Sequence, residues 1–152
     1  MQGKKQWHWW LATGFGAGLS PIAPGTVGTL FGIPLVLFSQ LMPVHIWILI
    51  VIFILCMSIF VIKEFSHDLT KIDHPSIVID EIVGFIVAMM FVPITWQNLA
   101  MAFVIFRFMD IVKPPPINWI DRKFSGSYGI VGDDIVAGLY TNLLLQVILQ
   151  IY

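Results

Sequence analysis

The stretch that decides the fold is VHIWILIVIFILCMSIFVI, which occupies residues 44–62. It carries no formal charge, and only His45 and Ser58 interrupt its apolar character. A helix needs about 20 apolar residues to cross the hydrocarbon core of a bilayer, which is roughly 30 Å thick. The length and composition of this stretch therefore predict a membrane-spanning helix.

The rest of the chain has the same character. Apolar residues make up 58% of the 152 residues and charged residues only 11%, against about 25% charged residues in an ordinary soluble domain. Further apolar runs cover residues 29–42, 82–96, 99–112 and 134–152. The first of them is short and contains Pro34, so its helix is expected either to kink or to begin near Gly25. We therefore expect an all-α, polytopic membrane helical bundle of about five spans, forming a single domain over residues 1–152.

The charged residues fall in three windows, residues 4–5, 63–81 and 107–134. If the five predicted spans alternate in direction, all three windows lie on one side of the membrane, and their lysines and arginines make that side cytoplasmic. This topology requires residues 7–19 to form an interfacial or re-entrant helix, because a crossing there would invert every later span. The net charge of −1 argues against a nucleic-acid partner.

Two acidic pairs adjoin predicted spans. Asp80 and Glu81 precede the apolar run that starts at Ile82, and Asp133 and Asp134 precede the last run. Adjacent carboxylates near lipid repel one another unless a cation or a strong donor joins them. Each pair is therefore either a ligand pair for a divalent metal ion or a helix start at which acids are favoured by the helix dipole.

A third group of charges follows a helical spacing. Arg107, Asp110 and Lys113 are three residues apart and should share one helix face. Ionisable side chains inside a span are candidates for function, although a salt bridge that only fixes the packing remains the alternative. The run Asp121-Arg122-Lys123 is interpreted as a solvated or headgroup-facing charge run.

The segment GLSPIAPGTVGT at residues 18–29 holds two prolines and three glycines and cannot be regular helix throughout. Irregular backbone at membrane depth is tolerated only against protein or a water-filled cavity. Free N–H groups where a helix opens near Gly25 suit a phosphate. The alternative is a plain interfacial turn capped by Thr26.

These clusters indicate one chemistry when they are taken together. Carboxylate oxygens suit Mg²⁺ or another hard cation, and cationic side chains beside them suit a phosphate. A metal ion that bridges a phosphate ester at a membrane surface predicts phosphoryl chemistry on a lipid headgroup. Two alternatives remain, a small cation- or proton-coupled transporter that uses buried carboxylates as a relay and a non-catalytic membrane subunit.

Three blocks of sequence then resemble the phosphatidylglycerophosphatase A family. They are GFGAGLSPIAPGTVGTL at residues 14–30, DHPSIVIDEIVGF at residues 73–85, and FRFMDIVKPPPINWIDRKFSGSYGIVGDDIVAG at residues 106–138. The blocks follow the family's order, and the remainder of the chain is apolar span.

The resemblance implies a Mg²⁺-dependent lipid phosphatase of the bacterial inner (cytoplasmic) membrane, with its active site facing the cytoplasm. Its substrate in the bilayer would be the phospholipid phosphatidylglycerophosphate, hydrolysed to phosphatidylglycerol and phosphate by either water or an aspartate as nucleophile. The expected catalytic residues are Asp80, Glu81, Asp110, Lys113, Asp133 and Asp134. The expected metal ligands are Asp80, Glu81, Asp110 and Asp134, and the expected phosphate-binding residues are Ser20, Gly25, Thr26, Arg107 and Lys113.

Overall fold

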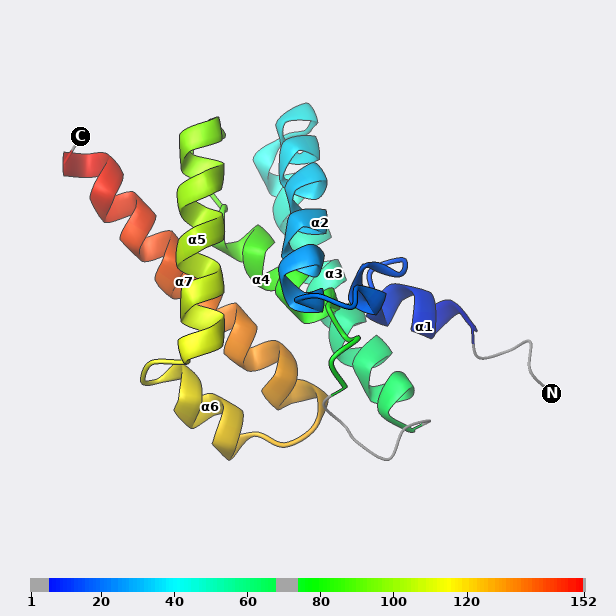
Figure 1. The fold of residues 1–152 in the computed structure, drawn as a ribbon. Coiled ribbons are helices and arrows are strands. Elements are labelled where there is room, and N and C mark those ends of the chain that lie inside the picture. The colour runs from blue at the N-terminus through cyan, green and yellow to red at the C-terminus, as the bar shows by residue number, and fades with distance from the viewer. Residues whose placement is uncertain (1–5, 68–73, 152) are drawn as a thin grey trace.

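The computed structural model describes residues 6–67 and 74–151, and the regular elements within those ranges are all helices (Figure 1). The α-helices are α1 (Gln6–Ala12), α2 (Pro24–Phe38), α3 (Val44–His67), α4 (Ile79–Ala88), α5 (Trp96–Val112), α6 (Ile117–Lys123) and α7 (Ser127–Ile151), with short 3₁₀ helices η1 (Ala17–Leu19) and η2 (Ser39–Leu41). The predicted all-α class is confirmed. Lys4, Lys5 and Lys71, which entered the topology argument, lie outside the described residues.

Within the described ranges, three helical segments are long and apolar enough to cross a membrane. They cover Pro24–Leu41, Val44–Phe65 and Ser127–Gln150. The segment Val44–Phe65 contains the stretch from which the fold was predicted. The helix α5 is slightly shorter, and its 17 residues extend about 25 Å.

The predicted span over residues 82–96 is divided in the structure. The helix α4 has only ten residues and ends at Ala88, and the chain then turns through Phe91, whose φ is 62°. Every residue of α4 except Glu81 is buried. A helix that is apolar on nearly all sides belongs inside a protein core, so neighbouring helices surround α4.

Glycines allow this enclosure of α4. A Cβ at Gly28 of α2 would stand 2.5 Å from the Cβ of Val78, directly before α4. A Cβ at Gly138 of α7 would stand 2.3 Å from the carbonyl oxygen of Gly84. Small residues permit such close approach between helices in membranes, so α4 lies between α2 and α7.

The helix ends gather in two groups at opposite ends of the bundle. Figure 1 shows the α2–α3 connection, the start of α5 and the C-terminal end of α7 at one end of the molecule. The start of α4, the end of α5 and the helix α6 lie toward the other end (Figure 1). At that end Arg107 of α5 lies near the acidic pair of α4, with 3.7 Å between Arg107 Nη1 and Glu81 Oε1.

The N-terminal segment is a short helix followed by a tight turn. The helix α1 ends at Ala12, and Gly14, Phe15 and Gly16 all have positive φ angles. The amide of Val78 donates a hydrogen bond to the carbonyl oxygen of Ala12 at 2.9 Å, which fixes this turn against the start of α4. Seven helical residues cannot cross a bilayer, and an interfacial location for residues 7–19 stays a prediction.

The start of the last helix was predicted wrongly. The helix α7 begins at Ser127, so Asp133 and Asp134 lie in its second turn and not at a helix start. Packing overrides the weak helix propensity of the Ser-Gly-Ser-Tyr-Gly segment, because a Cβ at Gly129 would stand 2.0 Å from the Phe124 carbonyl oxygen and Val131 is buried. A dipole-capping role for this acidic pair is therefore excluded.

Candidate active site

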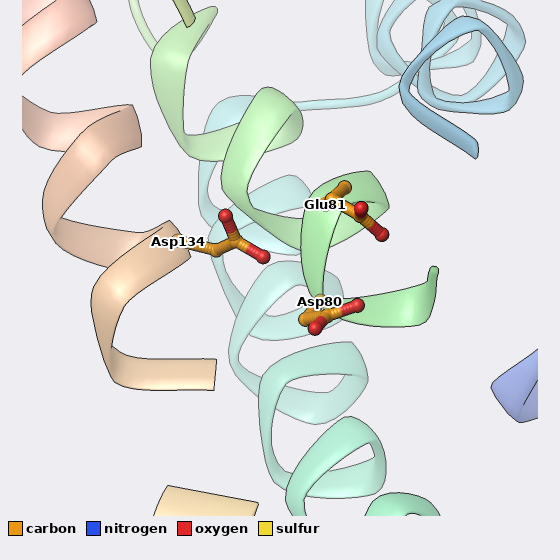
Figure 2. A group of neighbouring side chains, drawn as sticks. All are labelled: Asp80, Glu81 and Asp134. Carbon is orange, nitrogen blue, oxygen red and sulfur yellow. The ribbon is translucent and has the colours of Figure 1, made fainter. Parts of the chain in front are cut away.

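Three carboxylates meet where α4 passes α7. Asp80 and Glu81 belong to the first turn of α4 and Asp134 to the second turn of α7. One carboxylate oxygen from each lies within 4.8 Å of those from the other two. Figure 2 shows Asp134 extending from α7 toward the first turn of α4, which carries Asp80 and Glu81. Residues more than fifty positions apart thus form one acidic group, called here the acidic trio.

The acidic trio contains buried oxygens without donors. Among the described residues, Asp80 Oδ1, Glu81 Oε2 and Asp134 Oδ1 are buried and have no hydrogen-bond partner. Burying a carboxylate without a compensating partner is costly. A hard divalent cation prefers oxygen ligands of this kind, so the residues present fit a metal ion such as Mg²⁺.

Arg107 of α5 borders the acidic trio on one side. Its Nη1 lies 2.6 Å from Asp110 Oδ2 and 3.7 Å from Glu81 Oε1, and it also donates to Thr29 Oγ1 at 3.4 Å. Arg107 therefore connects α5 to both α4 and α2. A guanidinium with several donors in a fixed geometry is well suited to this role.

Lys113 lies at the other side of the site. It ends α5 with a left-handed φ of 47° before Pro114, as the proline run predicted. Its Nζ contacts Asp133 Oδ2 closely and lies 3.3 Å from Asp121 Oδ1. Lys113 thus forms its ion pairs with Asp133 and Asp121, while Arg107 pairs with Asp110. Asp110 and Lys113 nevertheless line the same cavity.

The surroundings of Lys113 keep its ammonium group charged. Partial burial alone would lower the pKa of Lys113, but the hydrogen bonds and charges of Asp133 and Asp121 outweigh burial and raise that pKa above its ordinary value. Asp121 is therefore part of the site, because it pairs with Lys113 and lines the cavity described below. It is also exposed to solvent, as are Arg122 and Lys123, in agreement with the predicted charge run.

These side chains line a polar cavity of about 130 Å³. All five predicted acids lie on its wall. The lining residues are His74, Pro75, Ile77, Asp80, Glu81, Asp110, Lys113, Asp121, Ile130, Asp133 and Asp134. Carboxylates outnumber the single lysine in this wall, so the field inside the cavity attracts cations.

The start of α2 closes the site from a third side. A Cβ at Gly25 would stand 2.1 Å from Glu81 Oε1 and 3.0 Å from Arg107 Nη2. The helix begins at Pro24, and its N-cap is Ala23, which has no capping side chain, so the alternative of a turn capped by Thr26 is wrong. Gly25 therefore lies directly against the site.

Of the five predicted phosphate-binding residues, only Lys113 is among the described residues that line the cavity. Gly25 and Arg107 lie close to Glu81 but outside that lining. Ser20 Oγ donates to the carbonyl oxygen of Ile22 at 2.8 Å within its own turn. Neither Ser20 nor Thr26 is part of the cavity lining described above. Their contact with phosphate remains a prediction.

Three residues of the site were not among those predicted from the sequence, namely Thr29, Asp121 and His74, and His74 lines the cavity. Thr29 donates from Oγ1 to the Gly25 carbonyl oxygen at 2.8 Å and accepts from Arg107, and its spacing of four from Gly25 was the available signal. Asp121 lay inside a charge run whose pairing depends on how α6 folds back beside α7.

Comparison with known proteins identifies the group to which this sequence is related. The sequence model of the family described as Phosphatidylglycerophosphatase A matches residues 10–149. The chain belongs to the phosphatidylglycerophosphatase A family. It is accordingly a phosphatase enzyme, carried on helices long and apolar enough to span a membrane.

Individual relatives agree with this assignment. The chain is 43% identical over 143 residues to a phosphatidylglycerophosphatase A of Escherichia coli (strain K12), covering 93% of this chain and 83% of that protein. It is 37% identical over 137 residues to a phosphatidylglycerophosphatase A of Haemophilus influenzae, covering 89% and 84%.

A third relative carries a different name. This protein of Bacteroides thetaiotaomicron is named provisionally as a phosphatidylinositol-3-phosphatase. It is 34% identical to this chain over 147 residues, which cover 90% of this chain and 90% of that protein. No solved structure matches the chain.

Proposed function

We propose that the protein hydrolyses the terminal phosphate monoester of phosphatidylglycerophosphate, giving phosphatidylglycerol and inorganic phosphate, and that it requires Mg²⁺. Two of the named relatives are phosphatidylglycerophosphatases, which supports this lipid as the substrate. The observation that carries the proposal is the acidic trio, whose buried oxygens have no donor among the described residues.

The proposed metal ligands are Asp80, Glu81 and Asp134, with Asp110 beside them. When bound there, Mg²⁺ polarises the phosphoryl group and offsets the charge that develops on its oxygens. Asp110 already accepts a hydrogen bond from Arg107 at 2.6 Å, so Arg107 sets the position of both Asp110 and Glu81.

The cationic side chains have separate tasks. Arg107 holds the acids of α4 and α5 in place, and Lys113 supplies positive charge in the wall of the cavity. The first turn of α2 adds free backbone N–H groups beside Gly25, a setting that favours an anion. Lys113 is therefore the positive side chain that a substrate phosphate meets in the wall of an otherwise acidic cavity, and the start of α2 lies nearby against Glu81.

The nucleophile is water or one of the aspartates. An aspartate nucleophile forms a phospho-enzyme, which retains label from substrate when turnover is quenched. Labelled protein recovered under denaturing conditions identifies the covalent route, and unlabelled protein during steady turnover favours direct attack by water.

The proposed location is the bacterial inner membrane with the cavity on the cytoplasmic side. Lysines and arginines concentrate in the charged windows, and such residues stay preferentially in the cytoplasm. The diacylglycerol part of the substrate remains in the bilayer while its headgroup reaches the cavity at the interface.

Phosphate release from purified protein tests the proposal. Phosphatidylglycerophosphate, phosphatidic acid and phosphatidylinositol 3-phosphate are offered in the same mixed micelles, with Mg²⁺ or with a chelator. We expect rapid release from phosphatidylglycerophosphate with Mg²⁺ and little without it. A transporter or a non-catalytic subunit would release none, and preference for another of these lipids would contradict the proposed substrate.

Amide variants then test the predicted acids in the same assay. Asp80→Asn and Asp110→Asn each remove one carboxylate, and we expect activity to fall about a hundredfold or more, the scale for losing one preorganised electrostatic group. Glu64→Gln is the matched control, because Glu64 lies on α3 and does not line the cavity. Activity near that of the wild type in both aspartate variants would remove those residues from the site.

A further inference from the structure

His74 lies in the segment that leads into α4 and lines the polar cavity together with the acids. It is partly buried. The reaction proposed above gives this side chain no task. Its two ring nitrogens have different surroundings, and this difference indicates what the imidazole does.

The Nδ1 atom of His74 is occupied by Ser76. The Ser76 backbone N–H donates to Nδ1 at 3.3 Å, and Ser76 Oγ lies 2.7 Å from the same nitrogen. A backbone N–H can only donate, so Nδ1 is an acceptor, and the neutral ring then carries its proton on Nε2. The ring therefore has an N–H group on the edge away from Ser76.

The surrounding structure fixes this arrangement. Ser76 is buried, and a Cβ at Gly18 would stand 2.0 Å from its carbonyl oxygen, so η1 lies directly against the segment. The Phe65 ring meets the imidazole edge to face, with the ring centroids 6.3 Å apart. The imidazole is thus held in place before any substrate binds.

The cavity is short of free donors. Among its described lining residues, only His74 and Lys113 carry side-chain N–H groups, and Lys113 is engaged by Asp133 and Asp121. We propose that His74 donates a hydrogen bond from Nε2–H to the phosphate group of the substrate and is a phosphate-binding residue of this site. The inference rests on the proposed phosphatase function and adds a specific donor to it.

Two amide variants separate binding of phosphate from support of the loop. The amide nitrogen of His74→Gln reaches the position of Nε2, whereas the amide of His74→Asn reaches only the position of Nδ1. A phosphate-binding role predicts that His74→Asn raises KM for phosphatidylglycerophosphate about tenfold, the cost of one hydrogen bond to a charged group. His74→Gln should stay within about threefold of the wild type, since its donor is retained.

A structural role predicts the opposite order. If His74 only holds Ser76, the asparagine variant keeps that contact and the glutamine variant loses it. Equal KM values for the two variants, or a lower KM for His74→Asn, would overturn the proposal. Thermal unfolding of both variants in detergent accompanies the kinetics and shows whether either variant has lost the fold.

Binding of inorganic phosphate distinguishes a failure of this inference from a failure of the proposed function. Calorimetric titration of the protein with phosphate in the presence of Mg²⁺ requires no turnover. We expect His74→Asn to bind phosphate about tenfold more weakly than His74→Gln. If the wild type binds phosphate in this manner but hydrolyses none of the lipids, the choice of substrate is wrong and the assignment of His74 stands.

Discussion

Gly25 of α2 lies directly against Glu81 of α4, and a Cβ at residue 25 would stand only 2.1 Å from Glu81 Oε1. The same atom would stand 3.0 Å from Arg107 Nη2. The absence of a side chain at residue 25 therefore allows the start of α2 to pack directly against Glu81 of α4 and Arg107 of α5.

The first prediction concerns this contact. Gly25→Ala should displace Glu81 and Arg107 and lower kcat about tenfold or more, because misplaced catalytic groups lose much of their effect. Phosphate release at saturating lipid measures the loss. Leu30→Ala on the exposed face of α2 is the control, and equal activity of the two variants would show that the close approach has no catalytic value.

The helices themselves were largely predictable. The apolar stretch at residues 44–62 gave the helix α3, and the proline run after Lys113 gave the end of α5. These features depend on local composition and on the missing amide of proline, which act without reference to the rest of the fold. The expectation that the separated acids approach one another also followed from the alternation of spans.

Other features depend on packing that no local pattern reveals. The early start of α7 at Ser127 depends on close packing against α6 and its end, where a Cβ at Gly129 would stand 2.0 Å from the Phe124 carbonyl oxygen and a Cβ at Gly132 would stand 3.3 Å from Ile120 Cγ2. The short core helix α4 was mistaken for half of a longer span, since an apolar run does not show whether lipid or protein surrounds it. The pairing of Asp121 with Lys113 likewise requires the fold of α6.

The second prediction concerns the stability of the Lys113 ion pairs against pH. A lysine whose pKa is raised on folding stabilises the protein fully below its unfolded pKa of about 10.4, and this benefit disappears as pH rises through the higher folded pKa. The melting temperature of the wild type should therefore exceed that of Lys113→Gln by a constant amount from about pH 7 to about pH 10. Above about pH 10, the difference in melting temperature between the wild type and Lys113→Gln should become smaller.

Thermal unfolding in detergent across this pH series measures the gap. A gap that closes already near pH 8, roughly two units below the ordinary lysine pKa, would show that Asp133 and Asp121 do not hold the proton on Lys113.

The third prediction separates the two acids that contact Lys113. The Asp133 side chain is 6% exposed and the Asp121 side chain is 45% exposed, and exposed ion pairs contribute little. Asp133→Asn should reduce kcat/KM about tenfold or more, because it removes the buried carboxylate that holds the Lys113 ammonium group in place. Asp121→Asn should change kcat/KM less than about threefold. Equal losses of kcat/KM in the two variants would contradict this prediction, because Asp121 would then matter to Lys113 as much as Asp133 does.

The most direct test of the account is metal binding by the acidic trio. Mn²⁺, which shares the preference of Mg²⁺ for oxygen ligands, is titrated into purified protein and free Mn²⁺ is followed by electron paramagnetic resonance. Asp80→Asn and Asp134→Asn should each weaken Mn²⁺ binding about tenfold or more, while Glu64→Gln binds Mn²⁺ as the wild type does. Unchanged Mn²⁺ affinity in both aspartate variants would contradict the account.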